Sequence, residues 1–170
     1  MTTSLMAQDR IEAAISLGSN LGDREATLRA AVTALDALPR TDVLRVSRFH
    51  ETDPVGPPGQ GKYLNAAVVI STGLPPRRLL EALLEIERQH GRVRTGIRNG
   101  PRTLDLDLTL YGDLVLADAG LEVPHPRFAT RRFVLAPLAE IAPHWRHPIV
   151  GASVDSLLRR LDQPAEAVSR

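Results

Sequence analysis

The stretch Leu104-Asp105-Leu106-Asp107-Leu108-Thr109-Leu110-Tyr111 alternates apolar and polar residues along its whole length. Successive side chains of a β-strand point to opposite faces, so the four leucines are expected to face one core together. By the same rule Asp105, Asp107 and Thr109 are expected to share the other face. The stretch therefore predicts a half-buried strand that displays two carboxylates side by side.

The segments around this strand alternate between β-rich apolar runs and runs with helical spacing of leucine, alanine and valine. The resulting order is strand, helix, two strands, helix, strand. This order predicts a single α+β domain with a ferredoxin-like core, in which a mainly antiparallel sheet is covered by helices. The predicted strands are residues 11–17, 43–49, 63–72, 104–111 and 121–126, and the predicted helices are residues 28–38, 75–91, 131–141 and 154–161.

Composition limits the classes of protein that this chain can represent. Its 170 residues are 43% hydrophobic and 24% charged, which suits one folded domain and excludes disorder throughout. We expect the domain to span residues 11–161, with short disordered tails at 1–10 and 162–170. The absence of cysteine excludes a disulfide framework, cysteine-ligated metal and a thiol nucleophile.

Three further observations concern location and partners. No stretch approaches the roughly 18 apolar residues of a membrane span, so no membrane association is expected. The polar start of the chain lacks the apolar core of a signal peptide, which predicts a cytoplasmic protein. A net charge of +1 argues against a general nucleic-acid binder, and we expect no nucleic-acid partner.

A basic, glycine-rich segment precedes the two carboxylates. Residues 91–102 (GRVRTGIRNGPR) hold four arginines and no acid. Arginine matches the geometry of phosphate oxygens, and a carboxylate pair suits Mg²⁺, which binds oxygen ligands only. A lone Asp-x-Asp is commonly a solvated strand face, but next to these arginines it favours phosphoryl or pyrophosphoryl transfer.

The residues alone leave alternatives open. A basic loop on a ferredoxin-like sheet is also compatible with RNA binding, although that mode normally uses aromatic side chains on the strands. Asn65 is placed either to recognise the edge of a heterocycle or to cap a turn, and His125, between two prolines, is either functional or structural. The segment Gly18-Ser19-Asn20 lacks a nucleotide-binding signature and is interpreted as a turn between a strand and a helix.

Several ordered blocks resemble the 6-hydroxymethyl-dihydropterin pyrophosphokinase family, and the resemblance extends from about residue 11 to 161. The most specific are G-R-V-R from Gly91 and R-N-G-P-R-T-L-D-L-D over 98–107. The others are I-S-L-G-S-N-L-G-D from Ile15, T-D-P-V-G from Thr52, Y-L-N-A-A-V from Tyr63, V-P-H-P-R from Val123 and R-R-F-V-L-A-P-L ending at Leu138.

The resemblance implies an enzyme of folate synthesis that transfers pyrophosphate from ATP to the hydroxymethyl group of 6-hydroxymethyl-7,8-dihydropterin and releases AMP. It implies that Asp105 and Asp107 bind two Mg²⁺ ions and act in catalysis, together with Arg92 and Arg102, which close over the phosphates. Other enzymes of folate synthesis are candidate partners. A member of the family that has lost activity and acts as a scaffold is the alternative within this resemblance.

The resemblance also assigns substrate contacts. The residues expected to bind the pterin are Thr52, Val55, Tyr63, Asn65 and Phe133, with Asn65 at the ring edge and the two aromatic side chains on its faces. The residues expected to bind ATP are Glu87, Arg92, Arg102, His125, Thr130 and Arg131. The sequence departs from the family pattern at Leu84, Thr95, Asn99 and Pro126, which leads us to expect the same reaction with altered affinity or loop closure.

Overall fold

The computed structural model describes residues 10–53, 58–59, 61–91 and 103–163. Its main sheet has five strands, in the order β2-β4-β1-β5, and β3 also pairs with β4. All of these pairings are antiparallel, which confirms the predicted α+β fold with a ferredoxin-like core. The strands are β1 (Ile11–Ser19), β2 (Thr41–Val46), β3 (His50–Thr52), β4 (Tyr63–Thr72) and β5 (Asp105–Tyr111).

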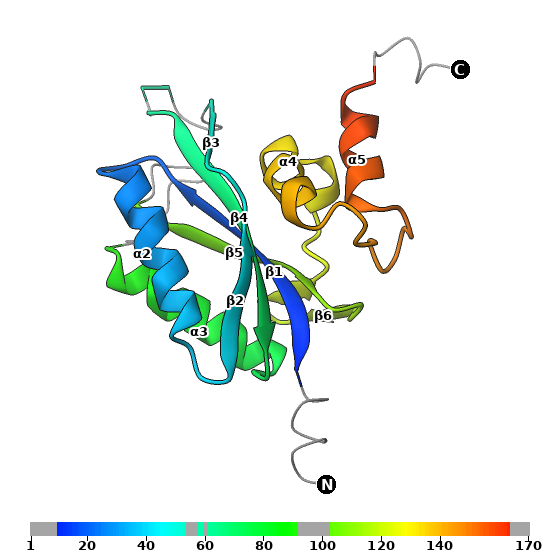
Figure 1. The fold of residues 1–170 in the computed structure, drawn as a ribbon, viewed down its shortest axis with the longest axis horizontal. Helices are drawn as coiled ribbons and strands as arrows, with labels where there is room; N and C mark the ends of the chain where they lie inside the picture. Colours follow the sequence, from blue (N-terminus) through cyan, green and yellow to red (C-terminus); the bar gives the residue numbers. More distant parts are fainter. Residues whose placement is uncertain (1–9, 54–57, 60, 92–102, 164–170) are drawn as a thin grey trace, which may run out of the picture.

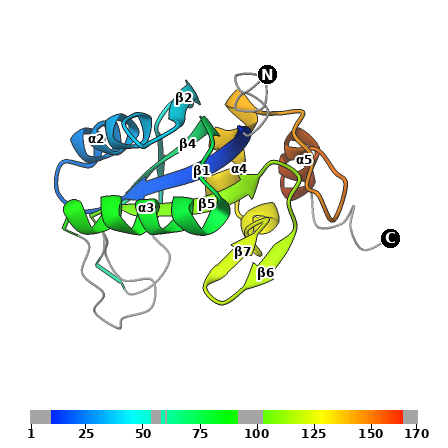
Figure 2. The same cartoon turned by 90° about the horizontal axis from the view of Figure 1, so that it is seen from below.

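Helices cover both faces of this sheet (Figure 1). On one face lie α2 (Arg24–Asp36) and α3 (Pro76–Gln89), and on the other lie α4 (Arg132–Ile141) and α5 (Val154–Leu161). Two short strands, β6 (Leu116–Asp118) and β7 (Leu121–Val123), pair as a hairpin beside β5 and α3 (Figure 2). A single 3₁₀ turn, η1 (Phe128–Thr130), leads from this hairpin into α4.

The helices begin where the sequence supplies capping groups. The Asp23 carboxylate accepts a hydrogen bond from the Ala26 N–H (3.1 Å), and Ser153 Oγ accepts one from the Ser156 N–H (3.1 Å). These contacts satisfy backbone donors at the first turns of α2 and α5. Pro76 opens α3, where a missing N–H costs nothing.

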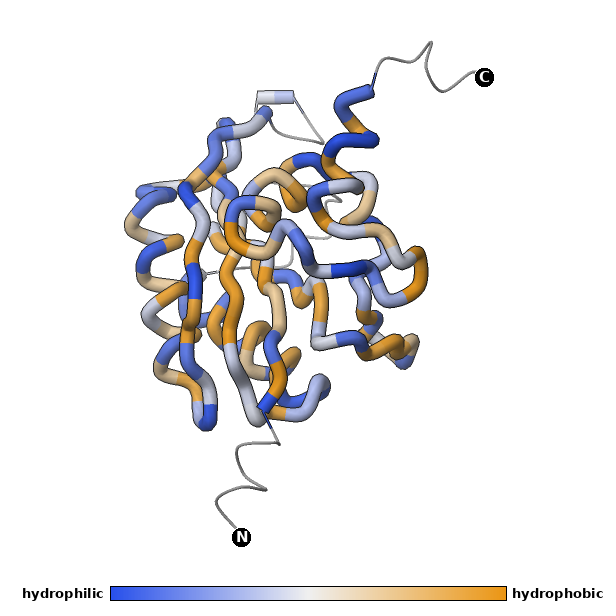
Figure 3. The backbone as a smooth tube through the Cα atoms, turned by 45° about the vertical axis from the view of Figure 1, so that its right-hand side comes forward, coloured by the Kyte–Doolittle hydropathy of each residue, from blue (hydrophilic) through white to orange (hydrophobic). Residues whose placement is uncertain are grey.

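The sheet is buried on both faces by two separate apolar clusters. Alternate residues of β1, β4 and β5 pack against α2 and α3, and the intervening residues of β1 and β4 pack against α4 and α5. Burial on both sides explains why Ala66–Ile70 is a continuous apolar run rather than an alternating one. Figure 3 shows the hydrophobic segments running through these strands.

The expectation that all four leucines of β5 share one face is wrong at Leu110. The register of β1 against β5 shifts, so that Ala14 lies opposite Leu110 and Ile15 opposite Leu108. Thr109 is therefore an extra residue, a β-bulge that reverses the alternation after Leu108. Leu110 consequently packs in the cluster under α4, whereas the other three leucines pack under α2 and α3.

Two other differences concern the ends of the chain and short elements. The strands β3 and β6 have only three residues each and were not predicted as separate strands. Most of the two predicted tails, residues 1–9 and 164–170, lies outside the described residues. Among the residues that are described, no helix has the length and apolar character that a membrane span requires.

We predict that Leu135→Ala lowers the free energy of unfolding by about 2–5 kcal/mol, because it removes a fully buried side chain that joins α4 to the sheet. Urea denaturation measures this loss. Ile149→Ala, at a side chain that is 66% exposed, is the control and should change stability by less than about 0.5 kcal/mol. Equal effects of the two substitutions would contradict the packing of α4 against the sheet.

Candidate functional site

A cavity of about 200 Å³ opens on the α4 side of the sheet, next to the region that α4 covers. Its floor is formed by three neighbouring strands in fixed register, because Gly18 of β1 pairs with Asn65 of β4 on one side and with Asp105 of β5 on the other. The lining residues are Ser16, Leu17, Gly18, Thr52, Asp53, Tyr63, Asn65, Asp105, Asp107, Arg127, Arg131 and Phe133. Seven of the predicted site residues therefore line one cavity.

The middle of the floor depends on the missing side chain of Gly18. A Cβ atom at this position would lie 3.1 Å from Asn65 Oδ1 and 3.5 Å from Tyr63 Cδ1. A contact of 3.1 Å is tighter than most contacts that a Cβ atom makes, so a side chain here would require the Asn65 amide to move by a few tenths of an ångström. Gly18 lies within β1 rather than in the predicted turn, which begins after Ser19.

Asn65 and Thr52 form the polar wall on the β4 side of the cavity. The Asn65 side chain is 4% exposed, and its Nδ2 donates a hydrogen bond to Thr52 Oγ1 (2.6 Å). This bond uses one amide donor and fixes the orientation of the amide group. Asn65 lies inside β4 and faces the cavity, so the alternative in which it caps a turn is wrong.

An aromatic ring stands on each of two different elements that border the cavity. Tyr63 begins β4, and Phe133 lies in the first turn of α4. The Arg131 guanidinium lies over the Phe133 ring, 5.5 Å from its centroid, which is a favourable cation–π distance. The cavity thus combines apolar ring surface with an amide edge, which suits a flat heterocycle.

Asp105 and Asp107 border the cavity from β5. Both are half-buried and lie on the same face, about 7 Å apart along the strand. The described residues contain no group of three or more acidic, histidine or cysteine side chains that could hold a metal ion. A Mg²⁺ ion on this carboxylate pair would therefore take its remaining ligands from water and phosphate oxygens, which is the usual arrangement for this ion.

Glu87 lies beneath these acids rather than in the cavity lining. Its side chain is 4% exposed, and its Oε2 accepts a hydrogen bond from the Leu106 N–H (2.7 Å). Leu106 stands between Asp105 and Asp107, so this bond ties α3 to β5 at the residue that joins the two acids. A carboxylate buried in this way is well placed to hold the acids in position.

His125 lines a second hollow of about 290 Å³, which shares Asp107 with the first cavity. Its Nδ1 accepts a hydrogen bond from the Arg127 N–H (3.1 Å), so the neutral ring carries its proton on Nε2. Burial lowers the pKa of His125, and the positive charges of Arg131 and Arg127 lower it further, against a smaller opposing effect of Asp105. His125 is therefore a neutral hydrogen-bond donor near pH 7.

Among the described residues, Thr130 is a further predicted site residue that does not line the first cavity. Thr130 is exposed in η1, and its Oγ1 donates a hydrogen bond to the Arg127 carbonyl (3.1 Å). Val55, Arg92 and Arg102 lie outside the described residues, as do Thr95 and Asn99 of the basic segment.

Five residues that line the cavity were not among the predicted site residues: Ser16, Leu17, Gly18, Asp53 and Arg127. Arg127 stands two residues after His125, and this proximity was the available signal. Gly18 and Asp53 lie within two of the family-like blocks, from Ile15 and from Thr52, but their place at the cavity comes from strand pairing and from neighbours distant in the sequence.

We predict that His125 titrates below its ordinary pKa of 6.5 in the metal-free protein. In the unfolded chain the pKa of His125 is the ordinary 6.5, so on acidification the unfolded state is protonated at a higher pH than the folded state. The free energy of unfolding should therefore fall as the pH drops from 6.5 through the lower folded pKa. Histidine Cε1–H NMR signals followed against pH measure the pKa, and the spectrum of His125→Gln identifies the resonance. A pKa at or above 6.5 would contradict the described environment.

Comparisons with known proteins identify the family and support the fold. Residues 14–143 match the model of the family described as 7,8-dihydro-6-hydroxymethylpterin-pyrophosphokinase (HPPK). The 2-amino-4-hydroxy-6-hydroxymethyldihydropteridine pyrophosphokinase of Bacillus subtilis (strain 168) is 48% identical over 141 residues, which cover 83% of this chain and 84% of the relative. The protein of the same name from Pseudomonas aeruginosa is 44% identical over 134 residues, covering 79% and 82%.

A solved structure supports the fold independently. The wild-type HPPK-DHPS of Plasmodium falciparum matches with a TM-score of 0.69 at 12% sequence identity, over 89% of this chain and 44% of that chain. This chain thus spans less than half of that longer protein. The fold, the cavity and the matched relatives lead to one conclusion: the chain belongs to the 7,8-dihydro-6-hydroxymethylpterin-pyrophosphokinase family.

Proposed function

We propose that this protein transfers pyrophosphate from ATP to the hydroxymethyl group of 6-hydroxymethyl-7,8-dihydropterin and releases AMP. One observation carries the assignment of this reaction to the cavity: the row Asn65, Gly18 and Asp105 crosses three adjacent strands. Asn65 and Asp105 are two strand spacings apart, or about 10 Å. The amide at one end suits a heterocycle, and the carboxylate at the other end suits a metal–phosphate group. A pterin and a triphosphate can therefore meet above Gly18.

The pterin would bind at the Asn65 end of this row. The Asn65 amide and Thr52 would contact its polar edge, while Tyr63 and Phe133 would lie against its faces. Binding of a ligand without matching donors and acceptors would be unfavourable, because the polar groups of the cavity would then be buried without hydrogen-bond partners. Val55 is proposed to add a main-chain contact from the loop after β3.

ATP would bind at the Asp105 and Asp107 end. Two Mg²⁺ ions are proposed to be held by these carboxylates, and when bound they would neutralise the triphosphate and organise its geometry. Arg131 and Arg127 line the same cavity and are suited to phosphate oxygens. Arg92 and Arg102 are proposed to close over the phosphates.

The second hollow gives the nucleotide a further set of contacts. It is lined by Leu80, Leu106 and Leu108 and adjoins Asp107 and His125. We place the adenosine part of ATP here, with the Nε2–H of His125 directed to a phosphate oxygen. Glu87 would act through its bond to Leu106 by holding the two acids, and Thr130 would help to set the turn that precedes Arg131.

No protein nucleophile is required for this reaction. The hydroxymethyl oxygen of the pterin attacks the β-phosphorus, and the bond from this phosphorus to the bridging oxygen of AMP breaks. The chain's own part is to bring both substrates together and to place positive charge around the transferred group.

Association with a second enzyme of folate synthesis is a further part of this proposal. It is supported by the solved chain named HPPK-DHPS and by the "Folic acid synthesis protein fol1" of Pneumocystis carinii, which is 37% identical to this chain over only 20% of its own length. In those proteins a similar domain is covalently joined to other regions.

The decisive assay is AMP release from ATP with the hydroxymethyl pterin, compared with a pterin that lacks the hydroxyl group. We predict that Asp105→Asn and Asp107→Asn each lower kcat by at least about a hundredfold, because each removes a carboxylate needed for charge neutralisation. Asp155→Asn, at a half-buried acid of α5 paired with Arg159 and away from the cavity, is the control and should retain activity. Calorimetry with Mg²⁺ and a non-hydrolysable ATP analogue should show weaker binding to Asp105→Asn and to Asp107→Asn than to the wild type. The Asp155→Asn control should bind like the wild type.

Other outcomes of this assay would favour the alternatives. Pterin binding without AMP release by the wild-type protein would support an inactive scaffold. Salt-dependent RNA binding without AMP release would support an RNA-binding module. Wild-type-like turnover by the Asp105→Asn, Asp107→Asn double variant would reject the metal assignment.

We further predict that Gly18→Ala raises the KM for the pterin by about tenfold, because the new methyl group pushes against the Asn65 amide. The KM for ATP should change much less. Gly18→Ser extends the series and should have a larger effect, since its side chain is longer. Steady-state kinetics with each substrate varied in turn measure both values, and an equal rise in the two constants would contradict this explanation.

A further inference from the structure

The strand β3 is too short to be held firmly by backbone pairing alone. It pairs only with β4, through His50 with Asn65, Glu51 with Leu64 and Thr52 with Tyr63. Yet its last residue, Thr52, receives the hydrogen bond that orients the Asn65 amide. The position of β3 therefore determines the polar wall of the cavity.

Side chains from both faces of the sheet hold this strand. Because side chains alternate along a strand, His50 and Thr52 face one side while Glu51 faces the other. On the first side, Glu140 of α4 contacts His50 Nε2 (2.5 Å) and accepts a hydrogen bond from the Arg48 N–H (2.9 Å). These contacts fix the start of β3 against α4.

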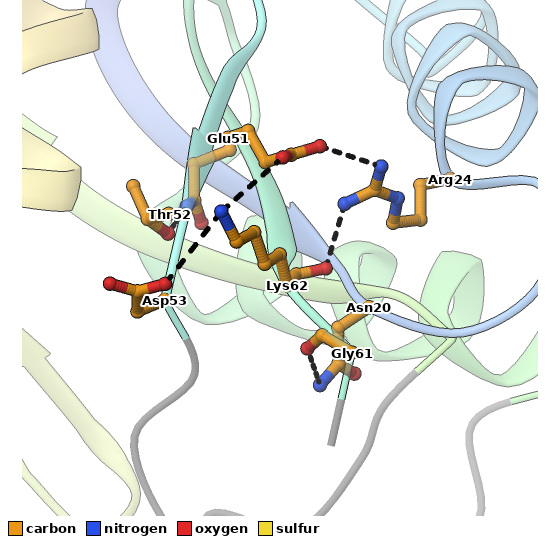
Figure 4. A network of polar contacts seen from close by, with 8 residues as sticks. Asn20, Arg24, Glu51, Thr52, Asp53, Gly61 and Lys62 are labelled. Atoms are coloured by element: carbon orange, nitrogen blue, oxygen red, sulfur yellow. Dashed lines mark hydrogen bonds and ion pairs between the residues drawn. The ribbon is translucent and has the colours of Figure 1, made fainter. Parts of the chain in front are cut away.

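On the opposite side, Arg24 holds both ends of the connection between β3 and β4 (Figure 4). One guanidinium nitrogen donates to Glu51 Oε2 (2.9 Å), and another donates to the carbonyl of Lys62 (2.8 Å). Glu51 precedes Thr52 by one residue, and Lys62 precedes Tyr63 by one residue. A single side chain thus links the two residues next to the cavity wall on both strands.

The turn between β1 and α2 adds a second contact of the same kind. Asn20, which is 5% exposed, donates from Nδ2 to the Gly61 carbonyl (3.3 Å). Lys62 Nζ lies 3.9 Å from Glu51 and 4.0 Å from Asp53, which adds weaker charge attraction on the same side (Figure 4). Arg24 does not line the cavity, so any influence on a ligand there must pass through β3 and β4.

We propose that Arg24 is a positioning residue for the heterocycle side of the site, and that Glu140 plays the same part from the opposite face. This inference rests on the proposed binding of the pterin beside Asn65. Partly exposed ion pairs add little to global stability, and the Arg24 and Glu51 side chains are 30% and 49% exposed. The contribution of Arg24 is therefore to geometry: it holds Thr52 and Tyr63 where the ring must fit.

The test compares pterin binding with ATP binding in the full chain. Arg24→Ala should weaken equilibrium binding of the hydroxymethyl pterin by about tenfold, because a small displacement of a contact group is costly to a closely fitted ligand. Binding of the ATP analogue and the midpoint of urea unfolding should stay close to wild type. Arg24→Lys should recover part of the loss, since an ammonium group can reach Glu51 but lacks the planar fork that also serves the Lys62 carbonyl.

Three further single substitutions sharpen the comparison. Arg78→Ala removes an exposed arginine of α3, one that pairs with Glu81 on the helix surface, and should leave both affinities unchanged. Glu51→Gln should reproduce part of the Arg24→Ala effect, and the two substitutions together should cost less than the sum of their separate effects. Glu140→Gln should independently weaken pterin binding without weakening nucleotide binding.

The outcomes separate this inference from the function on which it rests. If Arg24→Ala binds the pterin like the wild type, or if it weakens both ligands and lowers the urea midpoint together, the positioning role is overturned. If the wild-type protein binds the pterin but releases no AMP, the pyrophosphokinase activity is rejected. The comparison of pterin binding between the wild type and Arg24→Ala then still tests the positioning role of Arg24. Failure of the wild-type protein to bind the pterin would overturn both.

Discussion

The antiparallel pairing of β4, β1 and β5 is the constraint on which the rest of the molecule depends. Burial of β1 and β4 on both faces fixes their register, because a shift of one residue would exchange the sets of side chains that face the two apolar clusters. That register places Gly18 directly between Asn65 and Asp105. The hydrophobic packing that stabilises the fold thus also sets the separation of the two halves of the site.

Much of this architecture could be predicted because its signals are local. The β4 strand and the α5 helix match their predicted limits, since apolar runs and helical periodicity are properties of neighbouring residues. The exception in β5 is instructive. Alternation placed Leu110 with the other leucines, but the bulge at Thr109 arises from pairing with β1, and pairing between distant segments leaves no trace in the alternation itself.

The same division applies to the site. The spacing of Asp105 and Asp107 predicted a shared carboxylate face, and the structure places both at one cavity. The role of Gly18 could not be deduced from its neighbours in the sequence. Gly18 matters because it has no side chain, which leaves room for the Asn65 amide of another strand. The link from Arg24 to Glu51 and Lys62 was equally hidden, since it joins residues 27 and 38 positions apart in the sequence.

The site also shows how one sheet face can serve packing and chemistry together. Toward one end, Ala14, Val69 and Leu110 are covered by Phe128, Leu135 and neighbouring residues. Toward the other end, the same face presents small or polar residues, and the covering helix contributes Phe133 at its edge instead of closing over them. Apolar strand residues attract a covering helix, whereas Ser16, Gly18 and the two acids offer it little apolar area to bury. The change from apolar to polar side chains along three strands therefore determines where the covering layer ends and where a ligand can enter.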